Sequence, residues 1–172
     1  HGQKKKKEKK KHKHRHRHKD EEKEHKRVVL FICDPQNDYS DEGSIPIPNA
    51  NADSNRIYDM IKDHMDDILE IYVSLDSRHR THISNAISWV NKKGDIPEPF
   101  TIITANEVNK GKWKARQRSS QQDFVDYVSK VEANSRLPFT IWPDHCLIGT
   151  WGQAVMPQIN EALQDWAAHR LT

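Results

Sequence analysis

The feature that most constrains the fold is a pair of apolar runs separated by one stretch of helical periodicity. Residues 27–34, RVVLFICD, are rich in β-branched and aromatic side chains, which indicates a strand buried on both faces of a parallel sheet. From about residue 52 to residue 69, apolar residues recur at helical spacing, and residues 70–76, EIYVSLD, predict a second strand. This order predicts a β-α-β unit.

The rest of the chain continues the alternation. Helical spacing recurs at residues 121–132 and at 153–170, and LPFTIW at 137–142 predicts a third strand between them. Residues 77–120 are less regular, with one short extended piece at 100–103. We therefore predict an α/β fold: a doubly wound, Rossmann-like, mostly parallel sheet with helices on both faces. Three strands are few for such a sheet, so we expect its C-terminal strands to be missing.

Charge divides the chain near residue 27. Residues 1–27 hold 14 Lys and Arg against 5 Asp and Glu, a net charge of +9, whereas the whole chain carries +3. Because residues 1–26 have no apolar side chain to bury, we interpret them as a disordered basic tail, and residues 27–172 as one domain. The tail is either a solvated segment without a fixed partner, or a binder of nucleic acid or another polyanion, or a nuclear address.

Cysteine content and hydropathy indicate the compartment. Two cysteines cannot build a disulfide framework, and no apolar run is long enough to span a membrane. The charged N-terminal stretch also lacks the apolar core of a signal peptide. We expect an intracellular, cytoplasmic protein, with a nuclear location as the alternative that the basic tail suggests.

Three polar side chains lie at or just after predicted strand ends. Asp34 ends the first strand, Asp76 ends the second, and His145 follows the third. In open α/β sheets ligands bind beyond the carboxyl ends of the strands, so we expect these side chains to share a pocket rim. The alternative for each aspartate is a structural role as a helix cap or turn former.

Four segments, in this order, resemble a known family. They are DPQNDY at 34–39 with the loop GSIPIPNA at 43–50, LDSRHRTHIS at 75–84, PFTII at 99–103 and IWPDHCLIGTWG at 141–152. Residues 27–172 thereby resemble the isochorismatase-like cysteine hydrolases, and the last segment resembles the W-P-x-H-C block of nicotinamidase-like members. The resemblance implies the N-terminal portion of a hydrolase acting on a small amide, in a family whose members often form homo-oligomers.

The resemblance also implies a mechanism. In this family a cysteine thiolate attacks the amide carbonyl, an aspartate takes and returns the proton, and a lysine supports the charged states. Asp34 matches the general-base aspartate. The positions of the lysine and the nucleophile fall beyond Thr172, so we expect this chain to lack amidase activity. Cys146 matches a second, non-catalytic cysteine, and Cys33 is expected in the core.

A divalent metal (Zn, Fe or Mn) is the cofactor that the resemblance implies. Asp76 and His145 match two of its three ligands, but Arg78 stands where the family's D-x-H motif has histidine. Because arginine has no lone pair to donate, either His79 serves as the third ligand or Arg78 pairs with Asp76 in a metal-free site. Such a departure also favours the alternative that the chain is an inactive homologue binding a ligand or a protein partner.

Overall fold

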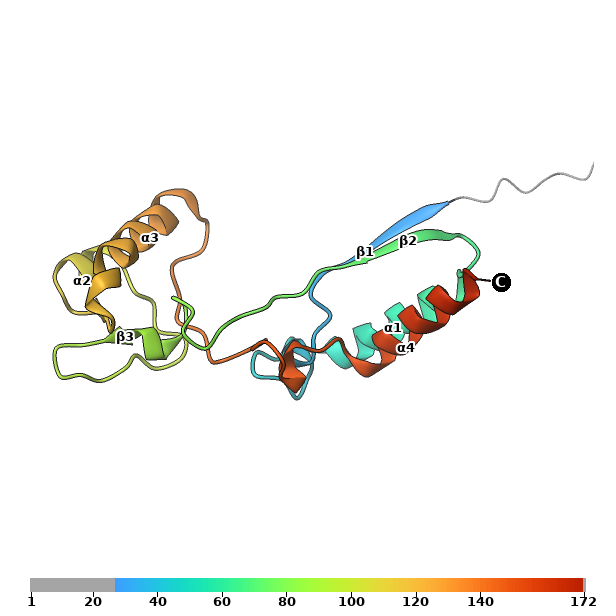
Figure 1. Cartoon of the computed structure of the whole chain (residues 1–172), viewed down its shortest axis with the longest axis horizontal. Coiled ribbons are helices and arrows are strands. Elements are labelled where there is room, and N and C mark those ends of the chain that lie inside the picture. The colour runs from blue at the N-terminus through green and yellow to red at the C-terminus, as the bar shows by residue number, and fades with distance from the viewer. Residues whose placement is uncertain (1–26, 172) are drawn as a thin grey trace, which may run out of the picture.

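The computed structural model describes residues 27–171, and the predicted basic tail at 1–26 lies outside them. Its helices and strands, in chain order, are β1 (Val28–Ile32), α1 (Ala50–Asp63), β2 (Ile68–Val73), β3 (Trp89–Val90), α2 (Ala105–Asn109), β4 (Lys114–Ala115), α3 (Gln121–Asn134) and α4 (Pro157–His169). Short 3-10 turns lie at Asn37–Tyr39 (η1), Ala86–Ser88 (η2), Arg118–Ser120 (η3) and Trp151–Gln153 (η4). Together, these helices, strands and turns form two lobes joined by two extended segments (Figure 1).

The first lobe confirms the predicted β-α-β unit. β1 and β2 pair in parallel, with Val29 opposite Glu70 and Ile32 opposite Val73, and α1 makes the connection between them. The fold is therefore α/β, as the sequence predicts. The helix predicted to start near Pro157 is also confirmed, since α4 begins at that residue. Proline is well tolerated there, because backbone N–H groups in the first turn of a helix have no partner within the helix.

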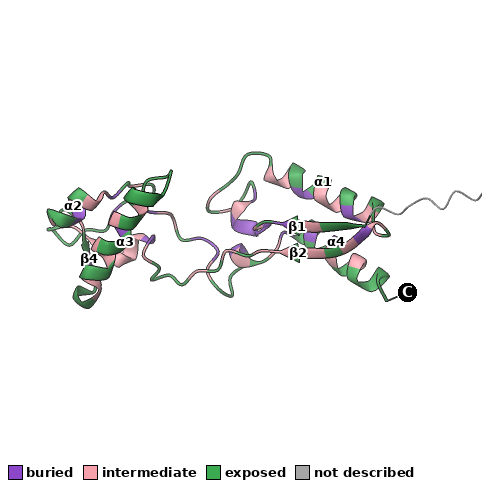
Figure 2. Cartoon of the chain, turned by 90° about the horizontal axis from the view of Figure 1, so that it is seen from above, coloured by how far each residue is buried: buried purple, intermediate pink, exposed green. Residues whose placement is uncertain are grey.

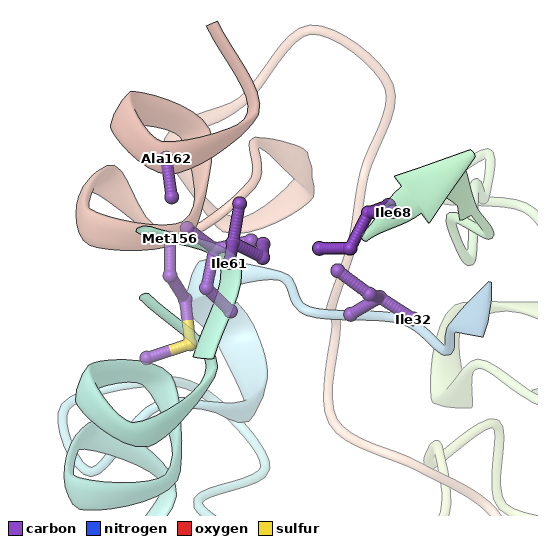
Figure 3. Close-up of a cluster of buried hydrophobic side chains, with 6 residues drawn as sticks. Ile32, Ile61, Ile68, Met156 and Ala162 are labelled. Atoms are coloured by element: carbon purple, nitrogen blue, oxygen red, sulfur yellow. The ribbon is translucent and has the colours of Figure 1, made fainter. Parts of the chain in front are cut away.

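The core of this lobe lies between the strand pair and two helices. Ile32 and Ile68 from the strands meet Ile61 of α1 and Ala162 of α4, with Met156 beside them (Figure 3). Ile61 and Ala162 are fully buried. Since α1 and α4 also pack side by side, both helices cover the same face of the strands (Figure 1).

The opposite face of the strand pair is uncovered, which corrects the prediction that β1 is buried on both faces. Val29 is 54% exposed, Phe31 is 62% exposed and Tyr72 is 52% exposed. Cys33, predicted to lie in the core, is likewise exposed. Within residues 27–171 no helix packs on this face (Figure 2). The apolar composition of β1 suits a strand buried on both faces, but helices cover only one of its faces.

The second lobe has its own core around Trp89. Trp89 lies in β3, which pairs antiparallel with β4, and its fully buried ring packs against Phe124 of α3 and Phe139, with Val108 of α2 in the same cluster. α2 starts with a capping box in which Thr104 and Glu107 satisfy each other's backbone N–H groups. The helix predicted at 121–132 is confirmed as α3.

The predicted third strand is wrong. Residues 137–142 make isolated bridges, Ile102 with Thr140 and Asn85 with Trp142, instead of joining the β1–β2 pair. Phe139 and Ile141 are buried in the second lobe's core, which holds this segment away from the parallel strands.

Across residues 27–171 no helix combines the length and apolar character that crossing a membrane requires.

Candidate functional site

Asp34 lies at the carboxyl end of β1, where the backbone turns sharply. Its φ is 48°, in the left-handed region that a non-glycine residue enters only at some cost. Two contacts to β2's C-terminal extension hold it there. The Asp34 N–H donates to the Ser74 carbonyl, and the Ser74 hydroxyl donates to Asp34 Oδ1 at 2.6 Å. The two parallel strands therefore position this carboxylate together.

A cavity of about 410 Å³ opens beside Asp34, between the end of β1 and α1. Asp34, Gln36 and Tyr39 are among the residues that line it, and most of the rest are apolar, including Ile57 and Met156. A pocket that is mainly apolar with a few converging polar groups is the usual form of a small-molecule site.

Gln36 connects the loop after β1 to the loop after β2. This fully buried side chain donates from Nε2 to the Asp76 carbonyl at 2.7 Å and accepts at Oε1 from the Asp76 N–H at 2.7 Å. Nε2 also donates to the Gln153 carbonyl at 2.8 Å. Because one amide is satisfied by three backbone groups, the positions of Asp76 and the loop before α4 are set relative to β1.

Three groups converge on a single oxygen of Asp76. Tyr39 donates its hydroxyl to Oδ2 at 2.9 Å, Arg78 donates from Nε at 2.8 Å, and His145 Nε2 lies 3.3 Å away. His145 is buried, and its Nδ1 donates to the Pro143 carbonyl at 2.8 Å, since a carbonyl can only accept. Asp76 and His145 thus meet, whereas Asp34, which we expected at the same pocket rim, lines the cavity beside α1, and neither Asp76 nor His145 lines that cavity.

The electrostatics of this cluster favour an ionised Asp76. Burial alone would raise the pKa of Asp76, but hydrogen bonds from Arg78 and Tyr39 outweigh it and hold the pKa below its ordinary value. Burial and the hydrogen bond to Asp76 together raise the pKa of Tyr39, so its hydroxyl stays protonated. Burial, with the charge of Arg78 second, lowers the pKa of His82 and favours its neutral form.

Asp38 joins the η1 turn to the Cys146 segment. Its Oδ2 accepts the Cys146 N–H at 2.6 Å and its Oδ1 accepts the Ser44 hydroxyl at 3.0 Å. A Cβ on Gly152 would overlap the Asp38 carboxylate, so this position requires glycine. Cys146 itself is fully buried, and burial raises the pKa of its thiol to about 11. A thiol in this state is a poor nucleophile.

The donor set does not fit a divalent metal. Asp76 and His145 face each other, but the Arg78 guanidinium donates to the oxygen a metal would bind. A divalent cation bound to this oxygen would lie close to the guanidinium and would be repelled by its permanent positive charge. His79 is exposed, and within the described part of the chain no three His, Cys, Asp or Glu side chains are grouped to hold a metal.

Sequence reasoning found part of this constellation and missed part. The strand-end rule pointed to Asp34, Asp76 and His145, and the structure brings the last two into contact. It missed Gln36, Tyr39 and Ser74 as partners of these residues. The signal for the first two was their place in the DPQNDY segment, whereas nothing in the sequence marked the serine.

Comparison with curated proteins and with solved structures found similar proteins. No family model matches the chain. It is 28% identical over 133 residues to a nicotinamidase of Saccharomyces cerevisiae, which covers 77% of this chain and 50% of that protein. The chain thus spans about half the length of the curated relative it matches.

Solved structures extend the likeness to the fold. The yeast nicotinamidase Pnc1p superposes with a TM-score of 0.51 at 26% identity, covering 82% of this chain and 53% of that one. Its complex with the inhibitor nicotinaldehyde gives the same TM-score and identity, covering 80% of this chain and 52% of that one. Residues 27–171 therefore adopt the isochorismatase-like, nicotinamidase-like fold over the part of it that the chain spans.

Proposed function

We propose that this chain carries the general-base portion of an isochorismatase-family amidohydrolase that acts on a small amide such as nicotinamide. The observation that supports it most is the placement of Asp34. This carboxylate ends a parallel strand, is held by Ser74 and lines a largely apolar cavity beside α1. The likeness to yeast nicotinamidase supports the same reaction class.

Asp34 would act by exchanging a proton with the nucleophile. A general base must lie within hydrogen-bond reach of the proton it takes, and a fixed carboxylate meets that need with little reorganisation. The hydrogen bond from Ser74 occupies Oδ1, and Oδ1 is the only Asp34 carboxylate oxygen for which residues 27–171 supply a hydrogen bond. Oδ2 is therefore the oxygen we assign to proton transfer.

The nucleophile is not provided by the cysteines of this chain. Cys146 is buried with a raised thiol pKa, and Cys33, which is exposed and directly precedes Asp34, matches no nucleophile position of the family. Catalysis in this family needs a lysine and a cysteine at positions that have no counterpart in residues 27–171. We therefore expect the 172-residue polypeptide to release no ammonia from nicotinamide.

The test uses the complete product of the gene, with the coding sequence read beyond Thr172. If that product contains the family's lysine and cysteine, it should release ammonia from nicotinamide. Replacing Asp34→Asn should lower kcat by about 10³-fold, the usual size of a general-base contribution. Asp41→Asn, an exposed carboxylate in the following loop, is the matched control and should leave kcat unchanged.

Two results would contradict the proposal. One is full turnover by the Asp34→Asn variant. The other is turnover of nicotinamide by residues 1–172 alone, which would require a nucleophile that we do not assign.

A non-catalytic ligand- or protein-binding module is the second candidate. The Arg78–Asp76 ion pair favours it, because it occupies a position where the resemblance implies a metal ligand. This candidate predicts that the complete gene product binds nicotinamide, seen by saturation-transfer NMR, without releasing ammonia. Ammonia release that depends on Asp34 would eliminate it.

A further inference from the structure

Arg78 is held in place by both its backbone and its side chain. Its N–H donates to the Cys146 carbonyl at 3.0 Å, and its carbonyl accepts the Ile148 N–H at 3.1 Å, so residues 78 and 147 bridge in parallel. Its side chain is only 20% exposed and donates from Nη1 to the Ser84 hydroxyl at 2.6 Å. The guanidinium therefore has a defined position against Asp76.

The other two groups of the cluster are arranged as metal ligands usually are. His145 gives its Nδ1 proton to a backbone carbonyl, which directs Nε2 at Asp76 Oδ2, 3.3 Å away. Such an outer hydrogen bond is the common way to orient a ligating imidazole. Only the position of the third ligand differs, because Arg78, a permanent cation, stands there in place of a residue that can donate a lone pair.

We propose that Arg78 is the built-in cation of the Asp76–His145 cluster, so that this cluster takes no divalent metal, and that Arg78→His alone would convert it into a metal site. The guanidinium supplies the positive charge that Asp76 pairs with, and its fixed backbone would place an imidazole next to the two existing ligands. One residue thus decides whether this site uses a metal or N–H donors.

The experiment is a Co²⁺ titration of the full chain followed by proton–nitrogen NMR. The six histidines within residues 1–26 can bind Co²⁺ themselves, so the readout is paramagnetic broadening of the Asp76 and Cys146 amides rather than total metal bound. The variants are the wild type, Arg78→His, Arg78→Lys, which keeps the charge, and Arg78→Gln, which removes the charge without adding a ligand.

We expect no broadening of these amides in the wild type or in Arg78→Lys at Co²⁺ concentrations that saturate Arg78→His. The histidine variant should bind about 100-fold more tightly than Arg78→Gln, because it adds a third ligand. Adding His145→Ala to Arg78→His should abolish the effect. The dispersed Ile61 and Val128 signals report that each variant is folded.

Equal broadening in the wild type and in Arg78→His would overturn the proposal, and so would a folded Arg78→His variant that shows none. If the Arg78→His variant fails to fold, the comparison of Arg78→Gln with Arg78→Lys tests the proposal. Arg78→Gln should then bind Co²⁺ about tenfold more tightly than Arg78→Lys, because it lacks the repulsion, and equal affinities would overturn the proposal.

Discussion

Asp76 shows how far a single position can be anticipated. Its place at the end of an apolar run indicated a functional carboxylate, because parallel strands bring their carboxyl ends to one edge. Its partners came from three separate loops: Tyr39 after β1, Arg78 after β2 and His145 before α4. Those partners set its ionisation, which the sequence left open.

The lowered pKa of Asp76 gives a pH dependence with a definite sign. A carboxyl whose pKa is lower in the folded than in the unfolded chain stabilises the fold above the unfolded value, and that stabilisation is lost as the pH falls through the folded pKa. We expect Asp76→Asn to reduce the free energy of unfolding by about 2 kcal/mol. This difference from wild type should be constant above about pH 5 and shrink below about pH 4.

Urea unfolding at several pH values measures this effect. Asp41→Asn, in an exposed position, should match the wild type throughout. A difference between wild type and Asp76→Asn that grows as the pH falls would show that the sign is wrong.

Among the elements, α1 and β1 show opposite outcomes of sequence reasoning. The helical spacing correctly predicted a helix at α1, and its Ile61 packs against Ile68 of the strand pair and residues of α4. The apolar run of β1 indicated burial on two faces, yet Phe31 is 62% exposed. A run of residue types reports what a strand can pack against, whereas its burial depends on which elements arrive there.

The contact between α1 and α4 should carry much of the first lobe's stability. Ile61→Ala removes a fully buried side chain from this contact and should lower the free energy of unfolding by about 2–5 kcal/mol. Its neighbour Met60 is 40% exposed, so Met60→Ala should change the free energy of unfolding by less than about 0.5 kcal/mol. Equal effects of the two substitutions in urea unfolding would show that α1 does not pack as described.

For the whole molecule, the main feature is a division into two cores. One lies between the β1–β2 pair, α1 and α4, and the other surrounds Trp89. The two segments that join the lobes are held by the Arg78–Leu147 bridge and by the ion pair of Arg80 with Asp144. Asp76, Arg78 and His145 lie on these segments, so the geometry of this cluster depends on both lobes.

Separate cores should open separately. Val128→Ala leaves a void in the second core and should speed amide hydrogen exchange in α2 and α3, while protection in α1 and α4 stays at the wild-type level. Tyr127→Ala, at a 44% exposed neighbouring position, is the control and should have a smaller effect. An equal loss of protection in both lobes would mean that they unfold as one unit.

The sequence alone determined the α/β class, the β-α-β unit, α3 and α4, because the periodicity of apolar residues is a local property. Tertiary structure decided the rest. Residues 137–142 have the composition of a strand, but Phe139 and Ile141 pack against Trp89 and draw the segment into the second lobe. Tertiary structure likewise decided between the two alternatives that the sequence left open at Arg78, because its contact with Asp76 depends on loops whose paths follow from how the two lobes are joined.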